Sequence, residues 1–208
     1  MMSHPERSPE RDQALEAMLP YVSQTGWTMT SLLAAAGPDA DLLFPGGTRD
    51  MIEAYFDWAD RRMEAQAAAT DLSGLRVPAR VRAVLVIRFA QNRDYKDAVR
   101  RALGVLAMPG NGPLAARCTA RTVDAIWHAA GDASADFSWY TKRATLAGVY
   151  AATLLYWLRD YSFDDEATLA FLDRRLAGIG RIGRWRRQGE AALQRLRPDR
   201  CDRATPAT

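Results

Sequence analysis

The sequence has 208 residues, of which 48% are hydrophobic and 25% are charged, and its formal net charge is +3. The length suits one domain with a sizeable core; the chain is too apolar to be disordered, and it lacks the run of ~20 apolar residues that spans a bilayer. Two cysteines and two histidines exclude a disulfide framework and argue against a Cys- or His-based metal centre, so we expect neither a metal nor a cofactor.

Residues 1–10 are polar and acidic in part, without the apolar centre of a secretory signal, which predicts a disordered N-terminus and a cytoplasmic protein. Beyond them the hydrophobic period is that of helices. Three short helices are expected within residues 11–50, an order typical of a helix-turn-helix head. Longer helices within residues 51–178 would form the body, a helical ligand-binding bundle. The predicted fold is therefore all-α, a helical bundle with a three-helix head like that of TetR-type regulators.

A helix-turn-helix needs basic residues that neutralise DNA phosphates, and the expected head lacks them. No Lys or Arg occurs between Tyr21 and Thr48, and residues 39–44, at the place of the recognition helix, include two aspartates. Because this segment would repel the DNA backbone, the pattern predicts no nucleic-acid binding and a head that only packs. A TetR-type, ligand-responsive transcriptional regulator with an unusual head remains the alternative.

His128 and Asp132 are four residues apart, which places them on one helix face close to Ser134 and Asp136. A Ser-His-Asp triad can be imagined there, but a triad is defined by geometry and no nucleophile-elbow motif supports it. A capping or packing histidine is the more ordinary interpretation. We therefore predict no catalytic residue and a protein that is not an enzyme, with a lipid hydrolase built on His128 as a weaker alternative.

The stretch from Asp124 to Asp160 resembles the coenzyme Q biosynthesis accessory proteins of the Coq-nine family. Its most specific part is the run Gly-Asp-x-Ser-x-Asp-Phe-x-Trp-Tyr-Thr-x-Arg, which ends at Arg143, and the likeness extends over about residues 13–196. The resemblance implies a TetR-like homodimer that binds isoprenoid quinone intermediates. It also implies a partner, the hydroxylase that acts on demethoxyubiquinone.

The partner surface implied by the resemblance lies on the two helices that flank the Gly-Asp turn. The residues carried over to it are Asp124, Ile126, Gly131, Asp132, Asp136, Trp139, Tyr140 and Arg143. Ile126 stands where some relatives carry Met. Independently of the resemblance, one helix face carries Asp136, Trp139, Tyr140 and Arg143. Two aromatic rings beside an aspartate and an arginine suit an interface. Packing of both rings in the core is the open alternative.

A second set of side chains is expected to line an apolar channel for the isoprenoid tail, between helices of residues 81–158. An ordinary bundle core would have the same composition, and the sequence alone does not separate the two. The lipid-binding set is Leu85, Phe89, Leu103, Leu106, Ile126, Leu146, Tyr150 and Leu154.

The C-terminal segment holds the strongest charge asymmetry of the chain. Residues 174–203 contain ten arginines and three acidic residues, so the rest of the chain is net negative. Residues 179–197 combine an apolar stripe, a Trp and flanking arginines, which predicts an amphipathic helix in a bilayer interface; a solvated helix or a basic arm for nucleic acid are the alternatives. Residues 198–208 are predicted to be a disordered tail. The predicted membrane-binding residues are Ile182, Arg184, Trp185, Arg187, Leu193 and Leu196.

Together these patterns and the resemblance predict a lipid-binding accessory protein of ubiquinone biosynthesis. We expect it to bind isoprenoid quinone intermediates at the membrane and to present them to demethoxyubiquinone hydroxylase. Its expected location is the cytoplasm, in peripheral contact with the inner membrane, as a homodimer.

Overall fold

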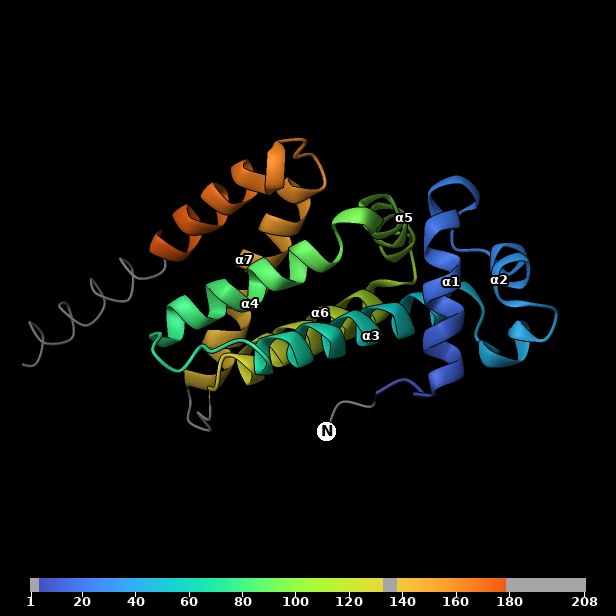
Figure 1. Ribbon diagram of the computed structural model, residues 1–208, viewed down its shortest axis with the longest axis horizontal. Coiled ribbons are helices and arrows are strands. Elements are labelled where there is room, and N and C mark those ends of the chain that lie inside the picture. Colours follow the sequence, from blue (N-terminus) through green and yellow to red (C-terminus); the bar gives the residue numbers. More distant parts are fainter. Residues whose placement is uncertain (1–3, 133–137, 179–208) are drawn as a thin grey trace, which may run out of the picture.

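The computed structural model describes residues 4–132 and 138–178, and every regular element in these ranges is helical (Figure 1). The elements in chain order are α1 (Pro9–Thr25), α2 (Met29–Ala36), η1 (Ala40–Leu43), α3 (Thr48–Ala68), α4 (Val77–Gln91), η2 (Arg93–Tyr95), α5 (Lys96–Leu106), α6 (Gly112–Ala129), α7 (Ser138–Trp157) and η3 (Phe163–Asp165). A further helix covers residues 166–178. The predicted all-α class is confirmed.

Short sequence signals set the helix ends of the head. Thr28 caps α2, because its hydroxyl oxygen accepts a hydrogen bond from the Ser31 amide at 3.1 Å. Gly37 ends the same helix with a φ of 100°, which an L side chain rarely adopts. The Thr48 hydroxyl donates to the Trp27 carbonyl at 2.8 Å and so joins the start of α3 to the head.

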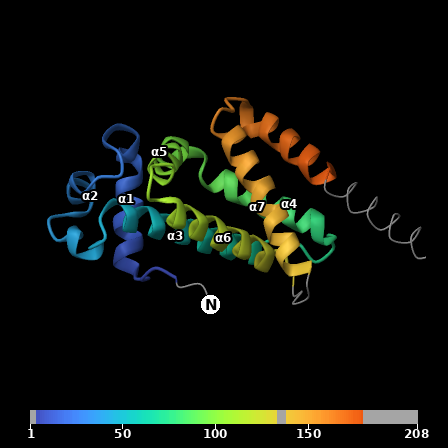
Figure 2. The same ribbon diagram turned by 180° about the vertical axis from the view of Figure 1, so that it is seen from behind.

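The body is built around α3 and α6, which run side by side (Figures 1 and 2). α4 packs against both of them, and α7 packs against α6. α1 stands across one end of α3, with α2 and η1 beyond it, on the side away from the body (Figure 1). α6 runs along α3 from the head side, and the end of α6 and the start of α7 lie on the side of the body away from the head (Figure 2).

Head and body share one hydrophobic core. Leu15 of α1 is fully buried and belongs to the same cluster as Tyr55 of α3. Trp27 lies between them in sequence, and its ring centroid is 5.1 Å from that of Tyr55. The Trp27 indole N–H donates to the Ala98 carbonyl at 2.9 Å. Apolar burial therefore fixes the head on the body.

The prediction that residues 1–10 are disordered is wrong for residues 4–10. Pro9 opens α1, and the Ser8 hydroxyl caps it by accepting from the Arg11 amide at 3.2 Å. A capping serine followed by proline is a helix start, so α1 begins before residue 11. Ahead of the helix, Arg7 forms an ion pair with the buried carboxylate of Asp57 at 2.6 Å, which holds the segment on α3.

Candidate functional site

An apolar hollow of about 270 Å³ lies between α3, α5, α6 and α7. Four of its lining residues, Leu103, Leu106, Tyr150 and Leu154, belong to the set predicted for lipid binding. The lining is completed by Phe56, Ala107, Ala115, Cys118, Thr119, Thr122 and Leu155. The volume is just under the ~300 Å³ at which small-molecule pockets begin.

Sequence reasoning missed the contribution of α6 to this hollow. Ala115, Cys118, Thr119 and Thr122 are spaced i, i+3, i+4 and i+7, so they share one face of the helix. Their small side chains leave space that larger residues would fill. A stripe of small residues at helical spacing was the signal available in the sequence.

The other residues of the predicted lipid-binding set lie elsewhere. The structure places Leu85, Ile126 and Leu146 in the packed core, as buried members of its main cluster. Phe89 lines a second and much smaller hollow. Helical periodicity assigns such residues to the interior, but it does not tell whether their neighbours leave space beside them.

The second hollow, of about 10 Å³, adjoins the first because Phe56, Tyr150 and Leu154 line both. Its other lining residues are Tyr55, Arg88, Phe89, Asn92, Val99 and Trp157. The Tyr55 hydroxyl donates to the Asn92 side-chain oxygen at 2.6 Å. Polar groups therefore gather beside the apolar hollow.

Arg88 on α4 and Asp60 on α3 form a buried ion pair beside the small hollow. Arg88 Nη2 lies 3.1 Å from Asp60 Oδ1, and the residues are 4% and 5% exposed. The Thr122 hydroxyl donates to the other oxygen of Asp60 at 2.9 Å. Burial raises the pKa of Asp60 to about 6, although Arg88 and Thr122 act to lower it.

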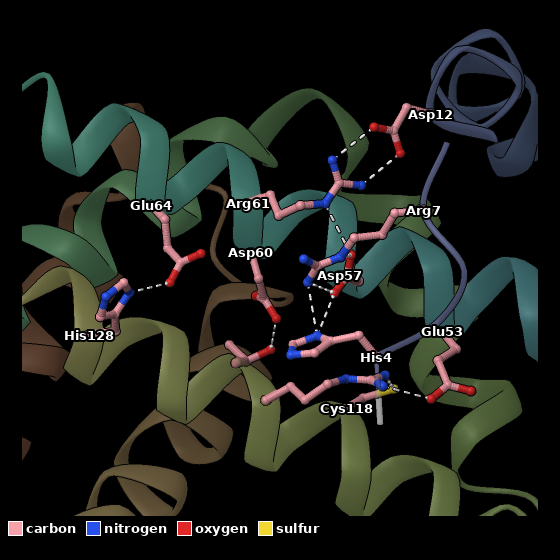
Figure 3. A network of polar contacts seen from close by, with 12 residues as sticks. His4, Arg7, Asp12, Glu53, Asp57, Asp60, Arg61, Glu64, Cys118 and His128 are labelled. Atoms are coloured by element: carbon pink, nitrogen blue, oxygen red, sulfur yellow. Dashed lines mark hydrogen bonds and ion pairs between the residues drawn. The ribbon is translucent and has the colours of Figure 1, made fainter. Parts of the chain in front are cut away.

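Asp60 also borders a polar pocket of about 290 Å³ between the N-terminal segment, α3 and α6. Figure 3 shows Asp57 between two arginines: Arg7 donates to it at 2.8 and 2.6 Å, and Arg61 donates to it at 3.0 Å. His4 contacts the same carboxylate at 3.2 Å. Burial alone would raise the pKa of Asp57, but the hydrogen bonds from these three side chains lower it.

His128, the residue of the hydrolase alternative, lines the same pocket (Figure 3). Its side chain is 85% exposed, and its Nδ1 lies 3.0 Å from Glu64. Asp132 pairs with Lys142 at 3.1 Å. The histidine and the aspartate of the imagined triad thus pair with different residues. Ser134 and Asp136 lie outside the described residues.

The residues of the predicted partner surface meet where α6 approaches α7. Arg143 pairs with Asp124, and its guanidinium carbon lies 3.8 Å from the centre of the Trp139 ring. Tyr140 is 72% exposed and lies edge-on to Trp139, with ring centroids 4.8 Å apart. Gly131 has a φ of 75°, the left-handed conformation that the turn after α6 requires. Charged and aromatic side chains therefore lie side by side at the molecular surface.

Ile126 requires a correction. It is fully buried in the core, so it does not reach a partner in this structure. Asp124 and Ile126 are two positions apart on a helix with 3.6 residues per turn, and they therefore lie on different sides of α6. Sequence resemblance carries both residues over without regard to the face they occupy.

A groove of about 450 Å³ between α6 and α7 lies beside these residues and includes Asp124, Trp139 and Arg143 in its lining. Most of its other lining residues are alanines. Ala115 and Thr119 line both this groove and the apolar hollow. The hollow and the predicted partner surface are therefore neighbours.

A further groove, of about 640 Å³, follows α5, α7 and the helix of residues 166–178. Tyr156 stacks on Phe171 there, with ring centroids 4.5 Å apart, and the neighbouring Leu155 is 60% exposed. Leu103 and Leu155 line both this groove and the apolar hollow. α7 thus presents apolar side chains to solvent along its outer face.

The predicted membrane helix, residues 179–197, lies outside the described residues together with all of its predicted contact residues. Just before it, Arg174 and Arg175 lie over the Phe171 ring, at 5.9 and 4.9 Å from its centroid. Within the described part of the chain, no helix combines the length and the apolarity needed to cross a bilayer.

Comparisons with known proteins indicate one family. A COQ9 family model matches residues 112–183, which include α6 and α7. The ubiquinone biosynthesis protein COQ9-A, mitochondrial, of Xenopus laevis is 31% identical over 202 residues, which cover 89% of this chain and 64% of that protein. The human COQ9 is 42% identical over 106 residues, 49% of this chain and 33% of the relative. The coq9 protein of Schizosaccharomyces pombe is 31% identical over 168 residues, with coverages of 78% and 66%.

The chain therefore spans between about a third and two thirds of the length of these curated relatives. A solved structure, described as a TetR transcriptional regulator from Nitrosomonas europaea ATCC 19718, superposes with a TM-score of 0.67 at 24% identity, covering 82% of this chain and 97% of that chain. At this identity the likeness shows the fold, and it confirms the TetR-like architecture. The family match over α6 and α7 and the relatives at 31–42% identity make this chain similar to the COQ9 family.

Proposed function

We propose that this protein is a non-enzymatic, lipid-binding accessory protein of ubiquinone biosynthesis that presents isoprenoid quinone intermediates to demethoxyubiquinone hydroxylase. Its relatives are named ubiquinone biosynthesis proteins. The observation that carries the proposal is the wall shared by two cavities. Ala115 and Thr119 line both the apolar hollow and the groove that holds Trp139 and Arg143. A ligand in the hollow would therefore lie directly beside a docked partner.

Apolar burial would hold such a ligand. Each Å² of apolar surface removed from water contributes about 25 cal/mol, so isoprene units among Leu103, Leu106 and Leu154 need no hydrogen bond to bind. A long tail exceeds the 270 Å³ of the hollow. Its remainder would follow the groove along α5 and α7, because Leu103 and Leu155 line both spaces.

Two features support a homodimer in peripheral contact with the inner membrane. Leu155 is exposed beside the stacked rings of Tyr156 and Phe171, and a second copy of the chain would cover this apolar face. The arginine-rich pattern of residues 179–197 would supply the membrane contact, with Trp185 among the apolar residues.

Lipid extraction from the purified full-length protein, combined with native mass spectrometry, tests the lipid role. The expected result is a dimer mass together with a prenylated compound that carries a quinone or phenol ring. Protein that retains no prenylated compound after expression in a ubiquinone-producing host would overturn the lipid role. A cell that lacks the gene should accumulate demethoxyubiquinone or an earlier precursor, and a normal quinone profile would contradict the role in this pathway.

The transcriptional regulator is a second candidate because the fold is shared with a protein described as one. At the place of the recognition helix, however, the structure has η1, a four-residue 3-10 helix that includes Asp41 and follows Asp39. So short and acidic a segment lacks both the length and the charge to bind in the major groove. A sequence-specific mobility shift on genomic operator fragments at low salt would favour the regulator.

A further inference from the structure

Arg88 is a buried charge beside the apolar hollow. Its side chain is 4% exposed and lines the hollow of about 10 Å³ that adjoins the larger apolar one. Asp60 holds one side of the guanidinium, with Nη2 3.1 Å from Oδ1, and the Tyr150 hydroxyl also interacts with it. A buried guanidinium is stable only where its donors are paired, so its remaining N–H groups need acceptors.

Two donors at this small hollow have no acceptor in the described part of the chain. They are Nη1 of Arg88 and the indole Nε1 of Trp157, and both atoms are shielded from solvent. A buried donor without an acceptor loses its hydration and gains nothing in return. Arg88 and Trp157 both belong to the lining of the small hollow, which makes it the place where one acceptor oxygen would serve these two donors.

The small hollow has room for one oxygen-sized group. A volume of about 10 Å³ corresponds to roughly one probe sphere, so a ring does not fit. Phe56, Tyr150 and Leu154 line both spaces, so the small hollow lies next to a ring placed in the larger one. The tail of such a ligand would then run toward α5, where Leu103 and Leu106 line the larger hollow.

The charge of Asp60 determines which kind of oxygen suits Arg88. Together the two residues carry no net charge when both are ionised. A carboxylate beside them would add an uncompensated negative charge in a buried site, whereas a neutral acceptor would not. The site therefore favours the carbonyl oxygen of a quinone-like ring over the carboxylate of a fatty acid.

We propose that Arg88, positioned by Asp60, is the specificity residue that binds a neutral carbonyl oxygen on the ring of an isoprenoid ligand whose tail occupies the apolar hollow. This inference rests on the proposed lipid-binding function and adds the polar contact that separates a ring-bearing ligand from a plain fatty chain. The competing arrangement is a buried water on the same donors, in which case a ring oxygen brings no advantage.

A competition among three ligands with the same alkyl chain tests the inference on the full-length protein. Decyl-benzoquinone, decylbenzene and undecanoate are incubated together with the protein, and the bound amounts are measured by extraction and mass spectrometry. Ratios of bound ligands are compared between wild type and variants, so that differences in water solubility cancel. Arg88→Met removes the donors, and the paired variant Asp60→Asn with Arg88→Met removes both charges.

Arg121→Met is the matched control, because it also removes a buried arginine from an ion pair. Arg121 is 5% exposed, pairs with Glu53 at 2.9 Å and lines neither hollow. The Arg88 variants should lower the ratio of bound decyl-benzoquinone to bound decylbenzene about tenfold or more, the factor expected for a hydrogen bond from a charged donor. Arg121→Met should leave this ratio unchanged.

Each other outcome identifies what is wrong. An unchanged quinone ratio in the Arg88 variants overturns the inference and leaves lipid binding intact. A fall in the ratio of bound undecanoate to bound decylbenzene instead shows that Arg88 serves a carboxylate, which also overturns it. Wild-type protein that binds none of the three ligands contradicts the proposed function itself. If both Arg88 variants unfold, the ratio of decyl-benzoquinone to decylbenzene bound by the wild-type protein is compared with the ratio of the same two ligands taken up by detergent micelles. Equal ratios overturn the inference.

Discussion

Replacing Asp60 with asparagine should change how the stability of the protein depends on pH. Burial raises the pKa of Asp60 from 3.8 to about 6 in the folded state. The folded protein therefore binds this proton more tightly than the unfolded chain does. The resulting contribution to stability is full below the unfolded pKa and is lost as the pH rises through the folded pKa. A difference of about two pH units corresponds to about 3 kcal/mol.

Asp60→Asn keeps the shape of the side chain and an oxygen for the Thr122 hydroxyl, but it cannot ionise. The free energy of unfolding of the variant minus that of the wild type should therefore increase by about 2.4 kcal/mol between about pH 4 and about pH 7. The attraction between ionised Asp60 and Arg88 already acts on this folded-state pKa, so it is not counted a second time. Urea unfolding followed by circular dichroism measures the difference, and a value that stays constant with pH would show that burial does not govern Asp60.

Asp57→Asn is the control with the opposite sign. Despite burial, hydrogen bonds from Arg7, Arg61 and His4 lower the pKa of Asp57, so folding favours its ionised form. This contribution is present above the unfolded pKa and is lost as the pH falls through the folded one. The variant-minus-wild-type difference should therefore decrease as the pH rises through the acid range. The same slope in both variants would indicate a general effect of removing a charge from α3.

Tyr140→Ala should weaken capture of purified demethoxyubiquinone hydroxylase without changing the melting temperature, because Tyr140 is 72% exposed; a lower melting temperature would place its ring in the core. Ile126→Ala should instead lower the free energy of unfolding by about 2–5 kcal/mol, as for other buried aliphatic residues, and a surface-like loss below ~0.5 kcal/mol would contradict its burial. Deleting residues 180–197 should abolish flotation with anionic liposomes and leave the helical circular dichroism of the body; undiminished flotation would count against a membrane helix. Asp160 accepts four hydrogen bonds from the segment that follows it, and despite burial they lower its pKa to about 2. Asp160→Ala should therefore reduce the free energy of unfolding in urea at about pH 7 by about 2 kcal/mol, and an unchanged midpoint would contradict this.

The helices of the fold could be predicted from the sequence because their signals are local. Thr28 and Gly37 bound α2 through hydrogen bonds and a backbone conformation within a few residues. The order of residues 4–7 could not be predicted, because it depends on the ion pair of Arg7 with Asp57, which is 50 residues away. No local pattern marks such a contact.

The candidate site was predictable only in part. Hydrophobic periodicity placed both Leu103 and Leu146 in the interior. In the structure Leu103 lines the apolar hollow, whereas Leu146 is packed in the core and does not line it. That difference depends on the size of the side chains opposite, here the small residues of α6. Arg88 was overlooked, although a single arginine between Ile87 and Phe89 was a visible signal of a buried polar contact.

The continuous core also bears on how the sequence can diverge. Because Leu15 and Trp27 fill the same interior as Tyr55, a truncated chain that started at α3 would lose the packing that keeps Tyr55 against Asn92 at the wall of the small hollow. Selection for ligand binding would then preserve the inward positions of α1 and α2, even in a protein that never meets an operator. Exposed positions of the head, such as Leu42 of η1, are free to be replaced.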